Sequence, residues 1–136
     1  MALLLDTCAV IWIFQNQPIR ESTADRINHA IAKREPVYVS PVTAWELGML
    51  VSRGRLTLPT DPQSSFDRML QGPGLHLAKI TPSILISSSF LPGKPPKDPA
   101  DRIFAATARE FGCPLVTRDR LLLEYAAEGH IQALAC

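Results

Sequence analysis

The chain has little net charge, few cysteines and no long apolar run. Its 14 Lys and Arg residues nearly balance its 13 Asp and Glu residues, so the overall charge does not indicate non-specific nucleic-acid binding. The cysteines number three and form no CxxC pair, which argues against a disulfide framework and favours a reducing cytoplasm. No apolar stretch is long enough to span a bilayer, and we see no secretory signal, so we expect a cytoplasmic protein with no membrane partner.

Length and composition predict a single folded domain over residues 1–136. Hydrophobic residues make up 46% of the chain and charged residues 20%, which is enough apolar material for a core and argues against disorder. We find no repeats and no low-complexity segment.

Short apolar strands alternate with helices along the chain. We expect strands over residues 2–5, 37–39, 75–80, 115–117 and 131–134. We expect helices over residues 7–14, 22–33 with Ser22 as N-cap, 41–53, 64–70, 81–90, 99–111 and 121–127, with a proline-rich loop over 91–99. This alternation predicts an α/β fold with a mostly parallel sheet, in which ligands bind at the carboxyl ends of the strands.

The first predicted strand ends in a carboxylate. In LLLDT three leucines lead directly into Asp6. Asp6 therefore either caps the helix that follows or lies at the edge of the sheet where sites are built, and from this residue alone both interpretations stand.

A second acid interrupts an apolar helix. In PVTAWELGMLVSRG, helical spacing places Glu46 on a broad stripe with five other residues: Val42, Trp45, Met49, Leu50 and Arg53. A glutamate among apolar neighbours is costly unless a group pairs with it or binds it. The alternative is that Glu46 lies at the edge of the stripe and reaches water or Arg53.

The remaining acids open helices. In KDPADRIFAATARE, Asp98 precedes Pro99, which is the pattern of an N-cap, and Asp101 falls in the first turn. We interpret Asp98 as structural. Asp101 either completes a capping-box-like arrangement at the start of the helix or faces a crowded site. In LVTRDR, Asp119 follows a strand just as Asp6 does, with the Thr117 hydroxyl nearby.

Four acids that meet at one sheet edge repel one another unless a cation lies among them. Clusters with oxygen ligands only suit Mg²⁺ or Mn²⁺. The chemistry that they serve best is metal-assisted attack of water on a phosphodiester.

Four segments in this order, LLLDT, PVTAWELGML, DPADRIFAATA and LVTRD, resemble a PIN domain, and more specifically the VapC family of toxins from type II toxin–antitoxin pairs. The resemblance spans nearly the whole chain. It implies a three-layer α/β/α sandwich, a Mg²⁺- or Mn²⁺-dependent endoribonuclease that hydrolyses RNA with metal-activated water, a cognate antitoxin and a homodimer. It assigns the catalytic and metal-binding acids to Asp6, Glu46, Asp101 and Asp119, and Thr7, Asp98 and Thr117 are candidates to support that site.

The chain departs from the family pattern where many members carry histidine. Cys8 and the run Pro95-Pro96-Lys97 occupy those neighbourhoods, and we interpret Cys8 as a small packed residue. Basic residues near the acids are candidates to contact RNA phosphates, namely Arg53, Lys97, Arg102 and Arg118. We expect Trp12 and Trp45 to belong to the core or to an interface.

Other functions remain open at this stage. A non-catalytic module of the same fold would pair with a partner protein, although four retained acids argue against it. A Cys-His hydrolase would use Cys8 with His29, His76 or His130, and no local motif supports it. A phosphatase of the aspartyl-phosphate type needs a second aspartate where this chain has Cys8.

Overall fold

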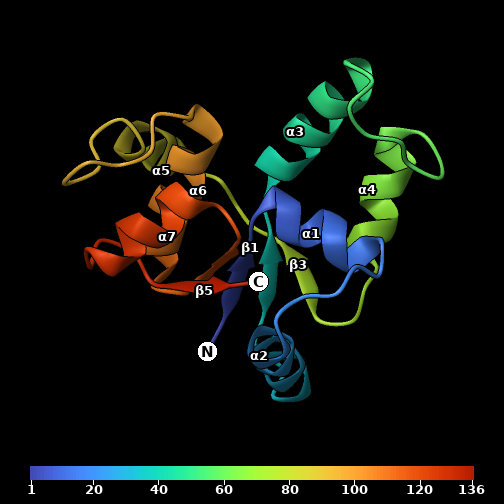
Figure 1. Ribbon diagram of the computed structural model, residues 1–136, viewed down its shortest axis with the longest axis horizontal. Helices are drawn as coiled ribbons and strands as arrows, with labels where there is room; N and C mark the ends of the chain where they lie inside the picture. Colours follow the sequence, from blue (N-terminus) through green and yellow to red (C-terminus); the bar gives the residue numbers. More distant parts are fainter.

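The computed structural model describes all 136 residues, in five short strands and seven helices (Figure 1). The strands are β1 (Leu3–Leu5), β2 (Val37–Val39), β3 (Leu75–Leu77), β4 (Leu115–Thr117) and β5 (Ala133–Ala135). The helices are α1 (Thr7–Phe14), α2 (Glu21–Ala32), α3 (Pro41–Ser52), α4 (Pro62–Leu70), α5 (Pro82–Ser87), α6 (Pro99–Phe111) and α7 (Arg120–Ala127). No helix combines the length and the apolarity needed to cross a membrane.

All strands run parallel, in the spatial order β3-β2-β1-β4-β5. The central strand β1 pairs Leu3 with Val37 on one side and Leu4 with Leu115 on the other. Because the strands are parallel, the segments that follow β1, β2 and β4 leave the sheet at the same edge. This edge receives Asp6, the start of α3 and Asp119.

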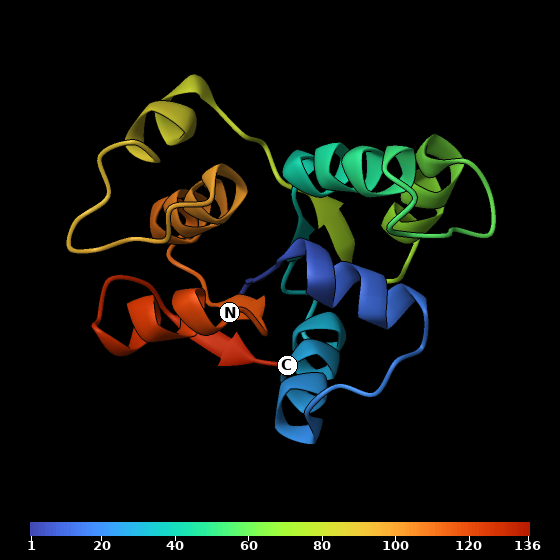
Figure 2. The same cartoon turned by 45° about the horizontal axis from the view of Figure 1, so that its top comes forward.

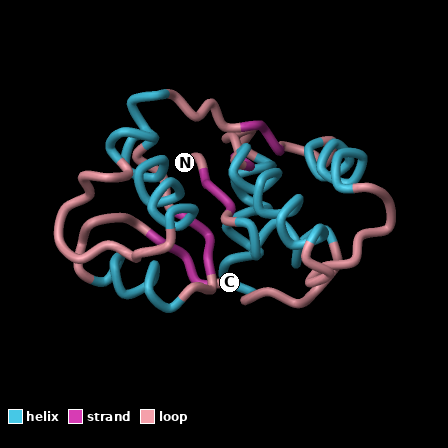
Figure 3. The backbone as a smooth tube through the Cα atoms, turned by 90° about the horizontal axis from the view of Figure 1, so that it is seen from above, coloured by secondary structure: helices cyan, strands magenta, loops and turns pink.

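Two apolar clusters cover the two faces of the sheet. Leu3 and Leu5 of β1 pack with residues of α1, α2 and α4 on one face. Leu4 points to the other face and packs with residues of α6 and α7. Coverage of both faces explains why β1 is apolar throughout, with no alternation of apolar and polar residues. The arrangement confirms the expected α/β/α sandwich, and Figure 3 shows the strands between the two groups of helices.

The structure corrects several predicted boundaries. Helix α2 begins before Ser22, with Arg20 at its N-cap and no side-chain cap, so Ser22 does not start it. Helix α4 begins at Pro62, earlier than predicted, because Asp61 accepts a hydrogen bond from the Ser64 amide. Strand β3 and helix α5 are shorter than predicted, and β5 begins at residue 133, two residues later than expected.

Helix α3 does not bury the stripe that its spacing suggested. Its buried residues are Val42, Thr43 and Leu47. Trp45 is 51% exposed, so it is not a core residue, and Glu46 is half-buried. Helices α1, α3 and α4 pack together in Figure 2, and α3 extends away from the edge of the sheet where it begins.

Candidate active site

Acidic side chains from four separate segments share one region at the carboxyl edge of the sheet. Asp6 follows β1, Glu46 lies on α3, Asp101 lies in the first turn of α6, and Asp119 follows β4. Their charges influence one another: Asp119 raises the pKa of Asp6, and Glu46 and Asp119 both raise that of Asp101. The fold therefore brings these four residues close enough for their charges to interact.

Thr117 joins two of the acids. Its side chain is fully buried, and its hydroxyl donates to Oδ2 of Asp6 at 2.5 Å while it accepts from the backbone amide of Asp119 at 3.0 Å. Burial raises the pKa of Asp6, and the hydrogen bonds from Thr117 and from the Ala9 amide oppose that rise. One buried hydroxyl thus fixes the acid after β1 against the segment after β4.

Both strand-end aspartates also cap helices. Oδ1 of Asp6 accepts from the Ala9 amide at 2.8 Å, and Oδ1 of Asp119 accepts from the Leu122 amide at 2.9 Å. The two interpretations of Asp6 therefore hold together, because one oxygen caps α1 and the other faces Thr117. Each cap holds its carboxylate in a fixed orientation at the start of a helix.

Glu46 is held by a pair of threonines. The Thr7 hydroxyl donates to Oε1 of Glu46 at 2.5 Å and lies 3.2 Å from the hydroxyl of Thr43. Burial raises the pKa of Glu46, the bond from Thr7 lowers it, and the nearby charges of Asp98 and Asp6 raise it. Thr7 follows Asp6 in the chain, so its contact with Glu46 connects α1 to α3 at the site.

Asp98, a candidate both to cap α6 and to support the site, lies beside the acidic cluster. It occupies the N-cap position of α6, but its side chain makes no capping hydrogen bond. Burial, together with the charges of Asp98, Asp119 and Glu46, raises the pKa of Asp101 to about 8. The interpretation of Asp98 as a structural cap is therefore wrong, because its side chain caps nothing. Its influence on Asp101 is consistent with its other candidate role, which is to support the acidic site.

The donor chemistry of the cluster fits a divalent cation. Its ligands would be carboxylate oxygens, and the acids raise one another's pKa, which a bound cation would reverse. As the side chains stand, no three or more His, Cys, Asp or Glu residues are arranged to hold a metal ion. Several of the oxygens instead make the hydrogen bonds described above, and each of these oxygens retains a second lone pair.

Cys8 lies at the mouth of the site. It is exposed, so the interpretation of Cys8 as a packed residue is wrong. Partial burial raises the pKa of its thiol to about 11, and the charges of Asp6 and Glu46 contribute. A protonated thiol is a poor nucleophile. His130 stacks on Tyr125 just before β5, at the end of the sheet opposite the acids, so it cannot act as a base for Cys8. The geometry does not support a Cys-His hydrolase.

Two of the four predicted phosphate-binding residues have structural roles. Arg102 donates to the carbonyl oxygens of Ser88 and Pro96 and thereby holds the loop before α6. Arg118 donates to the carbonyls of Cys136 and Pro18 and lies over the ring of Trp12, with 3.0 Å between its guanidinium carbon and the ring centroid. The other two, Arg53 and Lys97, are exposed, and their side chains make no hydrogen bond or ion pair.

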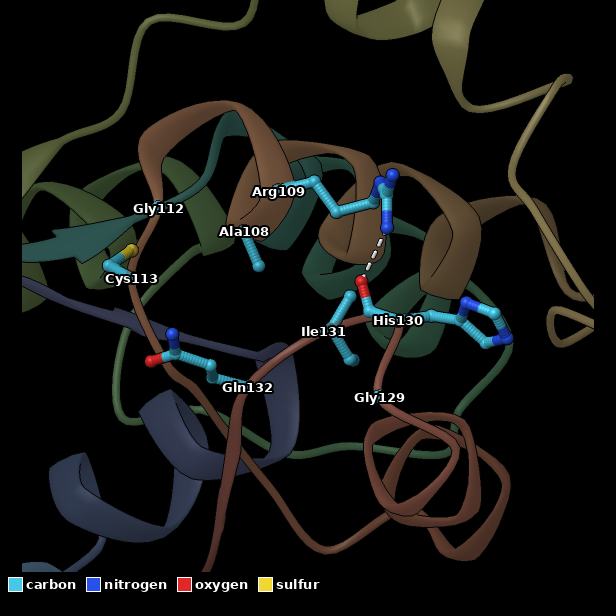
Figure 4. A pocket seen from close by; sticks show the side chains of 8 residues that line it. All are labelled: Ala108, Arg109, Gly112, Cys113, Gly129, His130, Ile131 and Gln132. Carbon is cyan, nitrogen blue, oxygen red and sulfur yellow. Dashed lines mark hydrogen bonds between the residues drawn. The ribbon is translucent and has the colours of Figure 1, made fainter.

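A cavity of about 330 Å³ lies at the opposite edge of the sheet from the acids (Figure 4). The end of α6 and the loop before β5 form its walls. Its Arg109 donates to the carbonyl oxygen of His130, as the dashed line in Figure 4 shows, and its Cys113 has a pKa raised to about 11 by burial. It contains no cluster of acids.

Sequence reasoning missed Thr43, whose hydroxyl lies 3.2 Å from that of Thr7. Arg55, one of the basic residues near the acids, shares a cavity with Glu46. The spacing could have indicated Thr43, because it lies three residues before Glu46 and therefore on the same side of α3.

Comparisons with known proteins agree with this geometry. The sequence matches the PIN domain family over residues 3–128. It is 33% identical over 120 residues to Ribonuclease VapC22 of Mycobacterium tuberculosis (strain ATCC 25618 / H37Rv), covering 88% of each chain. The fold is similar to VapBC2 from Rickettsia felis, solved bound to a promoter DNA fragment, with a TM-score of 0.70, 16% identity and coverage of 99% and 98%. It is also similar to DNA-bound VapBC from Salmonella typhimurium, with a TM-score of 0.67, 20% identity and the same coverage.

Proposed function

This chain belongs to the PIN domain family, and from that membership we propose that it is an endoribonuclease that acts as the toxin of a type II toxin–antitoxin pair. The observation that supports the proposal most directly is the meeting of four acids from four separate segments at the carboxyl edge of a parallel sheet. The similarity to a VapC ribonuclease gives the reaction class, which is hydrolysis of RNA phosphodiesters. We also propose that residues 1–136 act as one domain.

Asp6, Glu46, Asp101 and Asp119 would hold Mg²⁺ or Mn²⁺ in this proposal. The cation would supply a polarised phosphate and water of lowered pKa. The chain's own contribution is to orient the acids: Thr117 and the Ala9 amide fix the two oxygens of Asp6, and Thr7 fixes Glu46. Asp98 adds negative charge beside Asp101 and so strengthens the attraction for a cation.

The proposal is tested by incubating purified protein with total cellular RNA in Mg²⁺, in Mn²⁺ and in EDTA. Discrete new RNA ends that require metal are expected. Asp6→Asn should abolish them while the protein stays folded, because asparagine keeps the oxygen that caps α1 and removes the charge. Absence of cleavage with every metal, with the fold confirmed by circular dichroism, would favour a non-catalytic module that binds a partner protein.

We further propose that the chain pairs with a cognate antitoxin protein and forms a homodimer in the cytoplasm. Two solved structures of similar fold are VapBC complexes, which supports a protein partner. Co-purification with the product of an adjacent gene and size-exclusion chromatography of the toxin alone would test the two parts separately.

A further inference from the structure

A cavity of about 220 Å³ runs from the acidic cluster along α3. Six residues line it: Glu46, Met49, Leu50, Arg53, Arg55 and Asp98. Glu46, Leu50 and Arg53 lie on one face of α3, since they are separated by four and three residues. Arg53 lies about 10 Å beyond Glu46 along the helix axis, from seven residues at the rise of an α-helix.

The turn after α3 holds the second arginine in the same cavity. The Arg55 amide donates to the carbonyl of Leu50 at 2.9 Å, and the Gly54 amide donates to that of Val51 at 3.0 Å. These two bonds form a Schellman motif, in which the chain folds back over the last turn of the helix. Gly54 has a φ of +67°, a conformation that glycine adopts without strain. The backbone of Arg55 is therefore fixed beside Arg53.

Neither guanidinium is used elsewhere in the fold. Arg53 and Arg55 make no side-chain hydrogen bond and no ion pair, even with the carboxylates that share their cavity. Arg102 and Arg118, by contrast, donate to backbone carbonyls. Among these basic residues near the acids, Arg53 and Arg55 keep their guanidinium donors free for a planar anion such as phosphate.

The cavity on the other side of Asp98 is less suited to phosphate. Lys94 and Lys97 line it, but Glu124 and Glu128 line it too, at a distance from the acidic cluster. A phosphate there would meet carboxylates that no cation in the cluster neutralises. The two cavities meet at Asp98, and only the one along α3 combines free arginines with an apolar floor.

We propose that Arg53 and Arg55 bind a backbone phosphate of single-stranded RNA next to the scissile one, so that the strand leaves the acids along the C-terminal half of α3 over Met49 and Leu50. This inference rests on the proposed function and names a substrate subsite for it. An exposed backbone fits a site of this kind, because a single strand presents phosphates and bases to one face of a groove.

The test measures RNA binding separately from cleavage. Fluorescence anisotropy would follow a labelled, unstructured RNA oligonucleotide in Mg²⁺, with Asp6→Asn as the parent to prevent cleavage. Adding Arg53→Gln and Arg55→Gln should weaken binding by about tenfold at low salt. The slope of log affinity against log salt should also fall by about 0.7 for each phosphate that the variant no longer binds.

The matched control is Arg34→Gln in the same parent. Arg34 is exposed and lies after α2, at the opposite edge of the sheet, and its side chain makes no hydrogen bond. It should leave affinity and salt slope unchanged. The melting temperature of each variant separates an RNA contact from a structural role at the end of α3, because only a structural role would lower it.

The possible outcomes separate the inference from the proposed function. Selective loss of affinity in the double variant supports the inference even if wild-type protein cuts no RNA, in which case the function alone fails. Equal binding by the double variant and its parent would overturn the inference, as would equal losses in the double variant and the Arg34→Gln control. No RNA binding by the parent would overturn it too.

Discussion

Replacing Thr117 by valine should destabilise the protein and disturb its acidic site together. The substitution keeps the shape of a fully buried side chain and removes the hydroxyl that donates to Asp6 and accepts from the Asp119 amide. A hydrogen bond to a charged group contributes about 1.5–3 kcal/mol, and an amide left without a partner adds to the cost. We expect a loss of about 2–4 kcal/mol in the free energy of unfolding.

Urea unfolding and a thermal melt would measure this loss. At about 4 °C per kcal/mol for a chain of this size, the melting temperature should fall by about 8–16 °C. Thr117→Ser is the matched control, because it keeps the hydroxyl and removes one methyl group, at a cost of about 1 kcal/mol. Cleavage should also fall in the valine variant, because Asp6 loses the bond that lowers its pKa.

The result that would refute this reasoning is a valine variant at least as stable as the serine variant. That order would mean that the methyl group of Thr117 stabilises the fold through packing and that its hydrogen bonds contribute little.

Three further predictions concern charged residues. Without divalent cations, the melting temperature should fall as pH rises from about 4 towards 8. The reason is that Asp101 has a pKa of about 8 in the folded protein and 3.8 in the unfolded chain, so the folded protein holds a proton that the unfolded chain has released. Scanning fluorimetry at constant ionic strength would measure this fall, and a melting temperature that does not change with pH would contradict it. Mg²⁺ should therefore raise the melting temperature more at pH 8 than at pH 5, and EDTA should reverse the gain. Arg118→Lys should lower the free energy of unfolding by about 1–2 kcal/mol, as measured in urea, because lysine cannot both cover the Trp12 ring and donate to two carbonyls. A variant with unchanged stability and weaker RNA binding would instead assign Arg118 to RNA binding.

Much of the fold could be predicted because its signals are local. The apolar run before Asp6 and the sequence LVT predicted β1 and β4, and Pro99 with Gly112 marked both ends of α6. Edge elements were predicted less well. Strand β3 is short and its Leu77 is 51% exposed, so no burial pattern marks where it ends.

The candidate site was predicted only in outline, because hydrogen bonds between distant residues leave no local pattern. The contact between Thr7 and Glu46 joins residues 39 positions apart, and that between Thr117 and Asp6 joins residues 111 apart. Asp98 followed by proline predicts a cap, and only the fold shows that its carboxylate lies among other acids. Spacing likewise could not tell whether the stripe on α3 faces the core or a cavity.

Asp6 and Asp119 each belong to the acidic cluster and cap a helix, which limits the substitutions that can inactivate the protein without unfolding it. In a genetic selection for cells that survive its expression, substitutions of these two aspartates that remove the capping oxygen should lower the yield of folded protein, because the start of α1 or α7 loses its partner at a cost of about 0.5–2 kcal/mol. Asparagine at either position should yield a folded, inactive protein. Glu46 and Asp101 cap no helix, so a wider range of replacements at these two positions should recur among survivors that still accumulate the protein.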